Sequence, residues 1–159
     1  MEKSTESKAV IKQLTELLQG SNAHKSFSES IEGLPAKLRG VVPDNLPYSI
    51  WQLVCHIRIA QWDILEFSKN SKHESPEWPK GYWVKEKEPE SETQWDEALA
   101  QIESDKNDFL SLLKHNDIYA PFPHGDGQNL LREALLIADH TAYHTAEIIL
   151  IRRLLGAWK

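Results

Sequence analysis

Residues 138–156 read ADHTAYHTAEIILIRRLLG. The apolar residues of this stretch recur at the spacing of one helix face, as at Ile148 and Ile151. His140 and His144 stand four positions apart on the same strip. Glycine is common just past a helix end, so Gly156 is the expected terminator. The sequence predicts a long amphipathic helix from about Gln128 to Leu155, with both imidazoles on its inner face.

Two histidines at this spacing can chelate one metal ion. Helix residues four apart have Cβ atoms about 5–6 Å apart, which lets two rings converge at metal–nitrogen distances of about 2 Å. Two hydrogen-bonded core histidines are an equal alternative for His140 and His144 alone. His56 lies at the edge of the apolar face of another predicted helix, within reach of the pair in a bundle. Three neutral imidazoles would leave a metal one open position for water or substrate.

The rest of the chain also shows helical spacing, with no clear strand pattern. An N-terminal helical stripe leads from Val10 towards Leu34, and it is either kinked or ended near Gly20, Ser21 and Asn22. Capping-box spacing predicts a second helix from Ser49 to about Asn70 and a third from Ser91 to before Ala120. Four helices of this kind predict an all-α, antiparallel four-helix bundle, with residues 1–159 as a single domain.

A long connection separates the second and third predicted helices. Residues 71–90 contain three prolines and an aromatic group formed by Trp78, Tyr82 and Trp83. Connections of this length inside a compact bundle are often functional. The aromatic loop therefore either covers the metal pocket or plugs one end of the bundle, and we favour the plug.

Composition excludes several classes of function. The net charge is −6 with no cluster of Lys and Arg, so neither nucleic acid nor an anionic membrane surface is an expected partner. The longest apolar runs are far shorter than the roughly 20 residues that span a bilayer, and we expect no signal peptide. The single cysteine, Cys55, is expected to be a buried free thiol and suits a cytoplasmic location.

Missing motifs narrow the metal chemistry. Di-iron bundles use Glu-x-x-His, and no histidine here has a glutamate three positions before it. Zinc proteases of the His-Glu-x-x-His type need a glutamate where this chain has Thr141. Met1 is the only methionine, which excludes a haem held by methionine.

Two stretches resemble the DinB-like (YfiT-like) family of metal-dependent four-helix-bundle proteins: PYSIWQLVCHIRIAQWDIL around His56 and ADHTAYHTAEIILIRRLLG around His140 and His144. The AHKSF segment at His24 and the helix order are also similar. The resemblance implies a bundle that is often a homodimer, with His56, His140 and His144 holding nickel or zinc. It further implies one of two activities: S-transfer with a low-molecular-weight thiol, or metal-dependent hydrolysis.

Several side chains have two possible roles. In a hydrolase, Glu147 would be the catalytic base for the attacking water; otherwise it is an exposed carboxylate paired with Arg152 or a lysine. Asp63 and Asp139 either orient a ligating histidine or lie on the surface. His24 either lines the site or is buried and bonded to backbone.

Two classes of function follow for the whole chain. The first is a metal-dependent enzyme that acts on a small molecule, and the second is a noncatalytic metal-binding or stress-response protein. A metal with an open position would favour the enzyme, and a fourth protein ligand would favour the structural role.

Overall fold

The computed structural model describes residues 4–20 and 23–158 of the chain. These residues form helices and loops without a strand, and four of the helices are long. In order they are α1 (Thr5–Gln19), α2 (Phe27–Ile31), η1 (Ala36–Leu38), α3 (Ile50–Lys69), η2 (Lys80–Tyr82), α4 (Glu92–His115) and α5 (Leu130–Leu154), of which η1 and η2 are single 3-10 turns. In this described part, no helix is both long enough and apolar enough to span a bilayer.

Polar caps fix where the long helices begin and end. The Ser49 hydroxyl accepts a hydrogen bond from the Gln52 backbone N–H, and the Gln52 side-chain oxygen accepts one from the Ser49 backbone N–H, so the predicted capping box is present at α3. Ser91 likewise caps α4. Asn129 caps α5, which therefore begins slightly later than the predicted Gln128. Gly156 follows α5 with φ of 66°, the left-handed conformation expected of a terminating glycine.

The first helix ends at Gly20 and does not continue through a kink there. Gly20 has φ of 84° and follows the last residue of α1, and a Cβ at this position would approach the Ser26 side chain to 2.9 Å. A separate short helix, α2, then starts behind Ser26 with its own capping box to Glu29. Ser21 and Asn22, where we also expected the break, lie outside the described residues.

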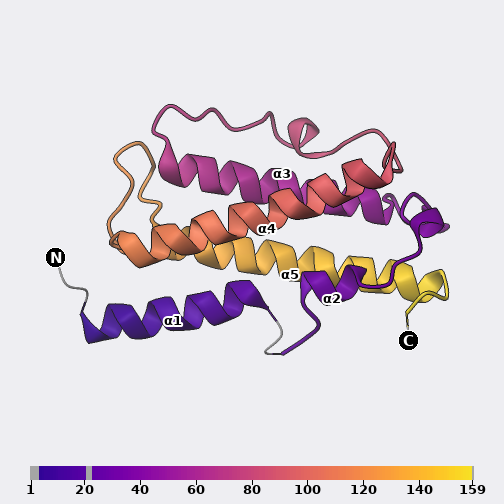
Figure 1. Cartoon of the computed structure of the whole chain (residues 1–159). Coiled ribbons are helices and arrows are strands. Elements are labelled where there is room, and N and C mark those ends of the chain that lie inside the picture. The colour runs from indigo at the N-terminus through magenta and orange to yellow at the C-terminus, as the bar shows by residue number, and fades with distance from the viewer. Residues whose placement is uncertain (1–3, 21–22, 159) are drawn as a thin grey trace.

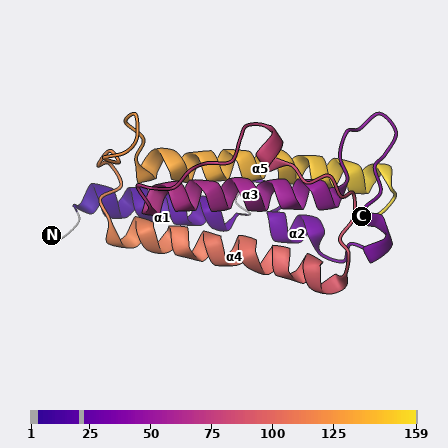
Figure 2. The same cartoon turned by 90° about the horizontal axis from the view of Figure 1, so that it is seen from above.

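Helices α3 and α4 run in the same direction, which corrects the expectation of an antiparallel bundle. Three contacts keep the same order along both helices: Trp51 with Trp95, Gln61 with Ile102, and Lys69 with Asp108. Figure 1 and Figure 2 show the connection between them returning along the length of the bundle before α4 begins. Helix α3 is about 30 Å long at 1.5 Å per residue, so a parallel neighbour requires a crossover of this kind.

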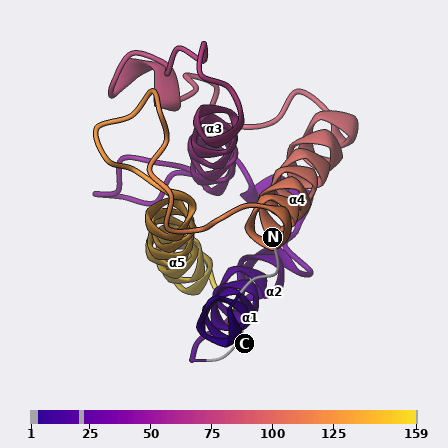
Figure 3. The same cartoon turned by 90° about the vertical axis from the view of Figure 1, so that its left-hand side faces the viewer.

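Helix α5 packs against both of these helices and against α1, as the end-on view shows (Figure 3). Two apolar clusters of buried residues occupy the bundle, one towards each end. The first includes Leu53 of α3, Ile102 of α4 and Ile148 of α5, and the second includes Leu14, Phe109 and Ile137. Between Ile137 and Ile148, α5 carries His140, Thr141, His144 and Thr145 instead of large apolar residues. The middle of the bundle is therefore a polar layer between two apolar ends.

Ser49 connects the start of α3 to the crossover loop, because its hydroxyl also donates to the Lys87 backbone carbonyl. We expect Ser49→Ala to lower the free energy of unfolding by about 2 kcal/mol, of which about 1 comes from the cap and about 1 from the second hydrogen bond. Ser91→Ala is the matched control, since Ser91 is exposed and its side chain caps only α4. That control should lose about 1 kcal/mol in urea unfolding. Equal losses for both variants would contradict the role of the Lys87 contact.

Candidate metal centre

Three histidines meet in the polar layer where α3 faces α5. The ring centroids of His56, His140 and His144 lie 4.5–4.8 Å apart. The Nε2 atoms of His56 and His140 are 3.0 Å apart, and each of the three rings offers a nitrogen within 4.8 Å of the others. The one-turn spacing on α5 supplies two rings, and the packing of α3 against α5 supplies the third. The sequence placed these residues on facing helices, and the structure brings them together.

A backbone contact sets the tautomer of His56. Its Nδ1 lies 2.9 Å from the carbonyl oxygen of Tyr82, which can only accept a hydrogen bond. Nδ1 therefore carries the proton, and Nε2 presents a lone pair towards His140. The side chain is only 2% exposed, and this burial lowers the pKa of His56 below its ordinary value. His56 is thus held neutral and oriented with its free nitrogen towards the cluster.

Glu147 makes the corresponding contact to His144. Its Oε2 is 2.6 Å from the Nδ1 of His144, and the two residues lie on adjacent turns of α5. As a carboxylate, Glu147 accepts a hydrogen bond from the Nδ1–H of His144, which leaves Nε2 of His144 free. Burial raises the pKa of Glu147. Of the two roles considered for Glu147, pairing with Arg152 is wrong, because Arg152 donates to backbone carbonyls of Ser30, Glu32 and Ala157. The role of catalytic base stays a prediction.

The cluster strongly disfavours protonation of its rings. Burial, followed by the neighbouring histidines, lowers the pKa of His140 to about 4. Burial and His56 lower the pKa of His144 to about 4 as well. Both rings are therefore neutral at physiological pH, which is the form that ligates a metal.

Aromatic rings cover the other side of His56. Trp83 stacks on the imidazole with centroids 4.0 Å apart, and Tyr48 stacks on Trp83 at the same distance. Tyr82 is buried, whereas Trp78 is 71% exposed and touches the edge of Tyr82. The aromatic loop was expected to be either a cover or an end plug. The contacts of Tyr82 and Trp83 are those of a cover over His56, which does not agree with the plug that we favoured, and Trp78 contacts Tyr82.

Asp63 acts on the cluster through Tyr82. It is 8% exposed, and its two carboxylate oxygens accept from the Tyr82 hydroxyl at 2.6 Å and from the His73 ring at 2.7 Å. Burial and this hydrogen bond raise the pKa of Tyr82 to about 12. Asp63 was considered as a direct partner of a ligating histidine or as a surface residue. The structure shows a third arrangement, in which Asp63 fixes Tyr82 and the carbonyl of Tyr82 fixes His56.

The other candidates lie away from the cluster. Asp139 is exposed, which agrees with its surface alternative. His24 is also exposed, and its Nδ1 donates to the carbonyl of Lys25 at 2.8 Å, so it neither lines the cluster nor is buried. Cys55 is buried as expected, and burial raises the pKa of its thiol to about 11. Sequence analysis missed His73 and the carbonyl of Tyr82, and a backbone carbonyl leaves no signal in a sequence.

The donor set fits a transition-metal ion. Two nitrogens bound to one ion at about 2 Å lie about 3 Å apart when the angle at the ion is near 90–110°, which agrees with the observed Nε2 separation of His56 and His140. The other ring nitrogen, Nδ1, donates a hydrogen bond to a backbone carbonyl at His56 and to a carboxylate at His144. These are the usual outer partners of ligating histidines. Among the described residues, this cluster has three potential ligands, so one or more positions would be left open.

These features define a helical-bundle protein with a three-histidine site. Residues 19–148 match the family model of the DinB superfamily, which covers most of the chain and both histidine-bearing helices. The chain belongs to the DinB superfamily. No curated protein and no solved structure matches it.

The histidine pKa values predict how the stability of metal-stripped protein depends on pH. An unfolded histidine has a pKa near 6.5, and folded His140 and His144 have values of about 4, so below pH 6.5 the unfolded chain binds more protons. Stability therefore falls as the pH decreases from about 6.5 to about 4. Urea midpoints across this range measure the effect. His144→Ala should flatten the slope, and His115→Ala, at an exposed position, should not; equal slopes in both would contradict the assignment.

The Asp63–Tyr82 contact predicts an effect of Asp63 on metal affinity. Asp63→Asn and Tyr82→Phe each remove part of the arrangement that holds the Tyr82 carbonyl at His56. We expect either change to weaken zinc binding by about 10-fold, at the lower end of the losses seen for outer partners of ligating histidines. Competition with a chromophoric chelator measures the affinity. Asp96→Asn, an exposed change on α4, is the control, and unchanged affinity in both test variants would refute the connection.

Proposed function

We propose that this protein binds one divalent transition metal ion, nickel or zinc, through the Nε2 atoms of His56, His140 and His144. The observation that carries this proposal is the convergence of three neutral imidazoles, two of which have the opposite nitrogen hydrogen-bonded to an acceptor. A merely structural histidine cluster would not require this arrangement of acceptors. Membership of the DinB superfamily supports the same conclusion.

We further propose that the protein is an enzyme acting on a small molecule at the open side of this site. The bound ion would act as a Lewis acid and lower the pKa of a group that reaches it. The chain holds the site together with Tyr82 at His56 and Glu147 at His144, and the stack of Trp83 and Tyr48 shields one face. Substrate would approach from the side of His140, which is partly exposed, and of Tyr143, which is 65% exposed.

Between the two reaction classes, the contacts of Glu147 favour thiol S-transfer over hydrolysis. A hydrolase needs a base beside the attacking water, and Glu147 was the candidate. Its carboxylate is instead engaged with Nδ1 of His144, on the far side of the ring from Nε2. Activation of a low-molecular-weight thiol needs no such base, because metal coordination itself deprotonates thiols near neutral pH. A homodimer and a cytoplasmic location stay predictions.

A metal titration tests the binding step. Chelator-stripped, untagged protein should bind one zinc, nickel or cobalt ion per chain, and cobalt should give the visible absorption of a nitrogen-ligated site. His140→Ala removes a ligand. Its metal affinity should therefore fall by more than the loss of about 10–100-fold that follows removal of an outer partner. His115→Ala replaces an exposed histidine on α4 and should bind as the unchanged protein does. No bound ion, or equal affinity in both variants, would refute the metal site.

The same cobalt-loaded protein separates the enzyme from the noncatalytic alternative. Addition of a low-molecular-weight thiol should shift the visible bands and add a sulfur-to-cobalt charge-transfer band, because an open position accepts the thiol. A site closed by a further protein ligand would show no change. Such a result, with the metal still bound, would leave the metal-binding proposal intact and remove the transferase proposal.

A further inference from the structure

A cavity of about 300 Å³ lies against a different face of α5 from the one that carries the histidine cluster. Its walls come from the end of α1, from α2, from the middle of α4 and from α5, and Gln61 of α3 also lines it. Most of the lining surface is apolar, and Leu17, Phe27, Leu99, Ile102 and Ile137 contribute to it. The histidines of the cluster are not among its lining residues. The volume is at the lower limit for small-molecule sites, which span about 300–1,000 Å³.

One lining residue carries an unsatisfied polar group. Thr145 is 2% exposed, and its hydroxyl has no hydrogen-bond partner among the residues that the structure describes. A hydroxyl buried without a partner costs about 1–3 kcal/mol, so such groups are rare unless something else satisfies them. Thr145 directly follows His144 on α5, and Thr141, which also lines the cavity, directly follows His140. The step of about 100° per helical residue turns the threonines away from the metal side.

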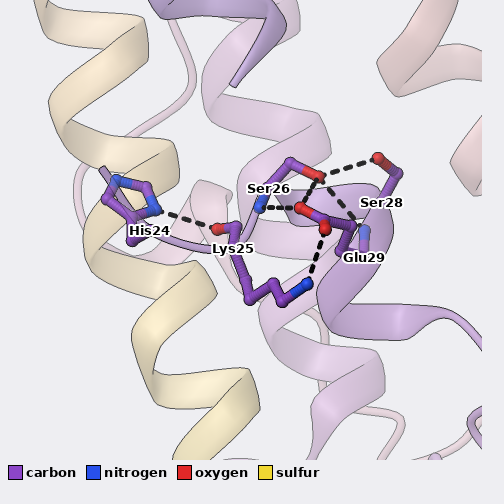
Figure 4. Close-up of polar contacts among 5 residues, drawn as sticks. All are labelled: His24, Lys25, Ser26, Ser28 and Glu29. Carbon is purple, nitrogen blue, oxygen red and sulfur yellow. Dashed lines mark hydrogen bonds and ion pairs between the residues drawn. The ribbon is translucent and has the colours of Figure 1, made fainter. Parts of the chain in front are cut away.

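The second polar feature is His24, at the rim of the cavity. Its Nδ1 donates to the carbonyl of Lys25, so its Nε2 is left as an acceptor. Figure 4 shows this contact and the neighbouring ion pair of Lys25 with Glu29, together with the Ser26 cap that holds the start of α2. These local contacts fix the segment that carries His24, so that its ring forms part of a defined wall.

Charge at the cavity is balanced. Lys106 and Glu103 both line it, and their side chains form an ion pair at 2.6 Å. An apolar lining with one paired cation and anion offers a charged ligand no unpaired counterion, and burying a charge without a partner is costly. A neutral ligand with a largely apolar body is therefore favoured, and a hydroxyl on it would suit both His24 and Thr145.

We propose that this cavity is a second binding site, for a small neutral molecule with an apolar ring or chain and one hydroxyl group. The ligand's apolar part fills the space between α1, α4 and α5, and its hydroxyl bonds to Thr145 or His24. The site is separate from the histidine cluster and does not depend on the proposed metal function. The two sites lie on adjacent faces of one helix, α5.

1-Naphthol is a suitable probe, because it is neutral and combines an apolar ring system with one hydroxyl. Titration of ¹⁵N-labelled full-length protein should give saturable amide shifts at Ile137, Ala138 and Thr141, with few changes elsewhere. Ala142→Leu places a larger side chain in the lining and should weaken binding at least about 10-fold by excluding the probe. Ala146→Leu makes the same change at an exposed position of α5 and should not affect binding.

Thr145→Val tests the hydroxyl separately. The change keeps the shape of the side chain and should weaken 1-naphthol about 3–10-fold, in line with one lost hydrogen bond. The affinity for 1-methoxynaphthalene, which cannot donate, should change less. Since the hydroxyl is unsatisfied in the free protein, Thr145→Val should also raise the melting temperature.

Failure of Ala142→Leu to fold would leave the test intact, because Leu17→Trp obstructs the cavity from the exposed side of α1. This variant should weaken 1-naphthol as well. Scattered or non-saturable shifts, or equal binding by the obstructed variants and Ala146→Leu, would overturn the proposal. Measuring stripped and zinc-loaded protein separately keeps this result distinct from that of the metal titration.

Discussion

The hydrogen bond from His56 Nδ1 to the carbonyl of Tyr82 is the contact on which the candidate site depends. It joins α3 to the loop that follows it, determines which nitrogen of His56 is free, and leaves that nitrogen 3.0 Å from His140. Without it, a neutral imidazole in a buried position could rotate or take the other tautomer. The contact is itself supported, because Asp63 and the stack of Trp83 and Tyr48 hold the loop in place.

The parallel course of α3 and α4 explains why the loop between them can contact His56. A short turn after α3 would have placed the next helix antiparallel and left no chain beside His56. The crossover instead runs back along the bundle, so η2 and Trp83 lie over the middle of α3. The loop buries one ring face and offers a carbonyl, while α5 contributes the two remaining rings. The bundle direction and the site geometry are therefore consequences of one connection.

Local signals in the sequence predict much of this structure. They do not predict the direction in which one helix runs relative to another that is distant in the sequence. Side chains within three or four residues of one another determine the caps at Ser49 and Ser91 and the pair formed by His140 and His144. The same patterns fit a parallel or an antiparallel neighbour, so the course of α4 was not predictable from them. The length of the connection was the available clue. The acceptor at His56 is a backbone carbonyl, which any residue could supply.

The polar layer in the middle of α5 runs against the requirements of stability. Large apolar side chains at His144 and Thr145 would join the two apolar clusters into one core, whereas the existing residues bury imidazoles and an unsatisfied hydroxyl. Positions that break local rules without a structural gain are where function is most often found. On one side of this layer, imidazole nitrogens converge at the spacing of a metal ion; on the other, the buried Thr145 hydroxyl has no partner within the described part of the chain. Both departures are explained if each side of the layer binds something that the chain itself does not provide.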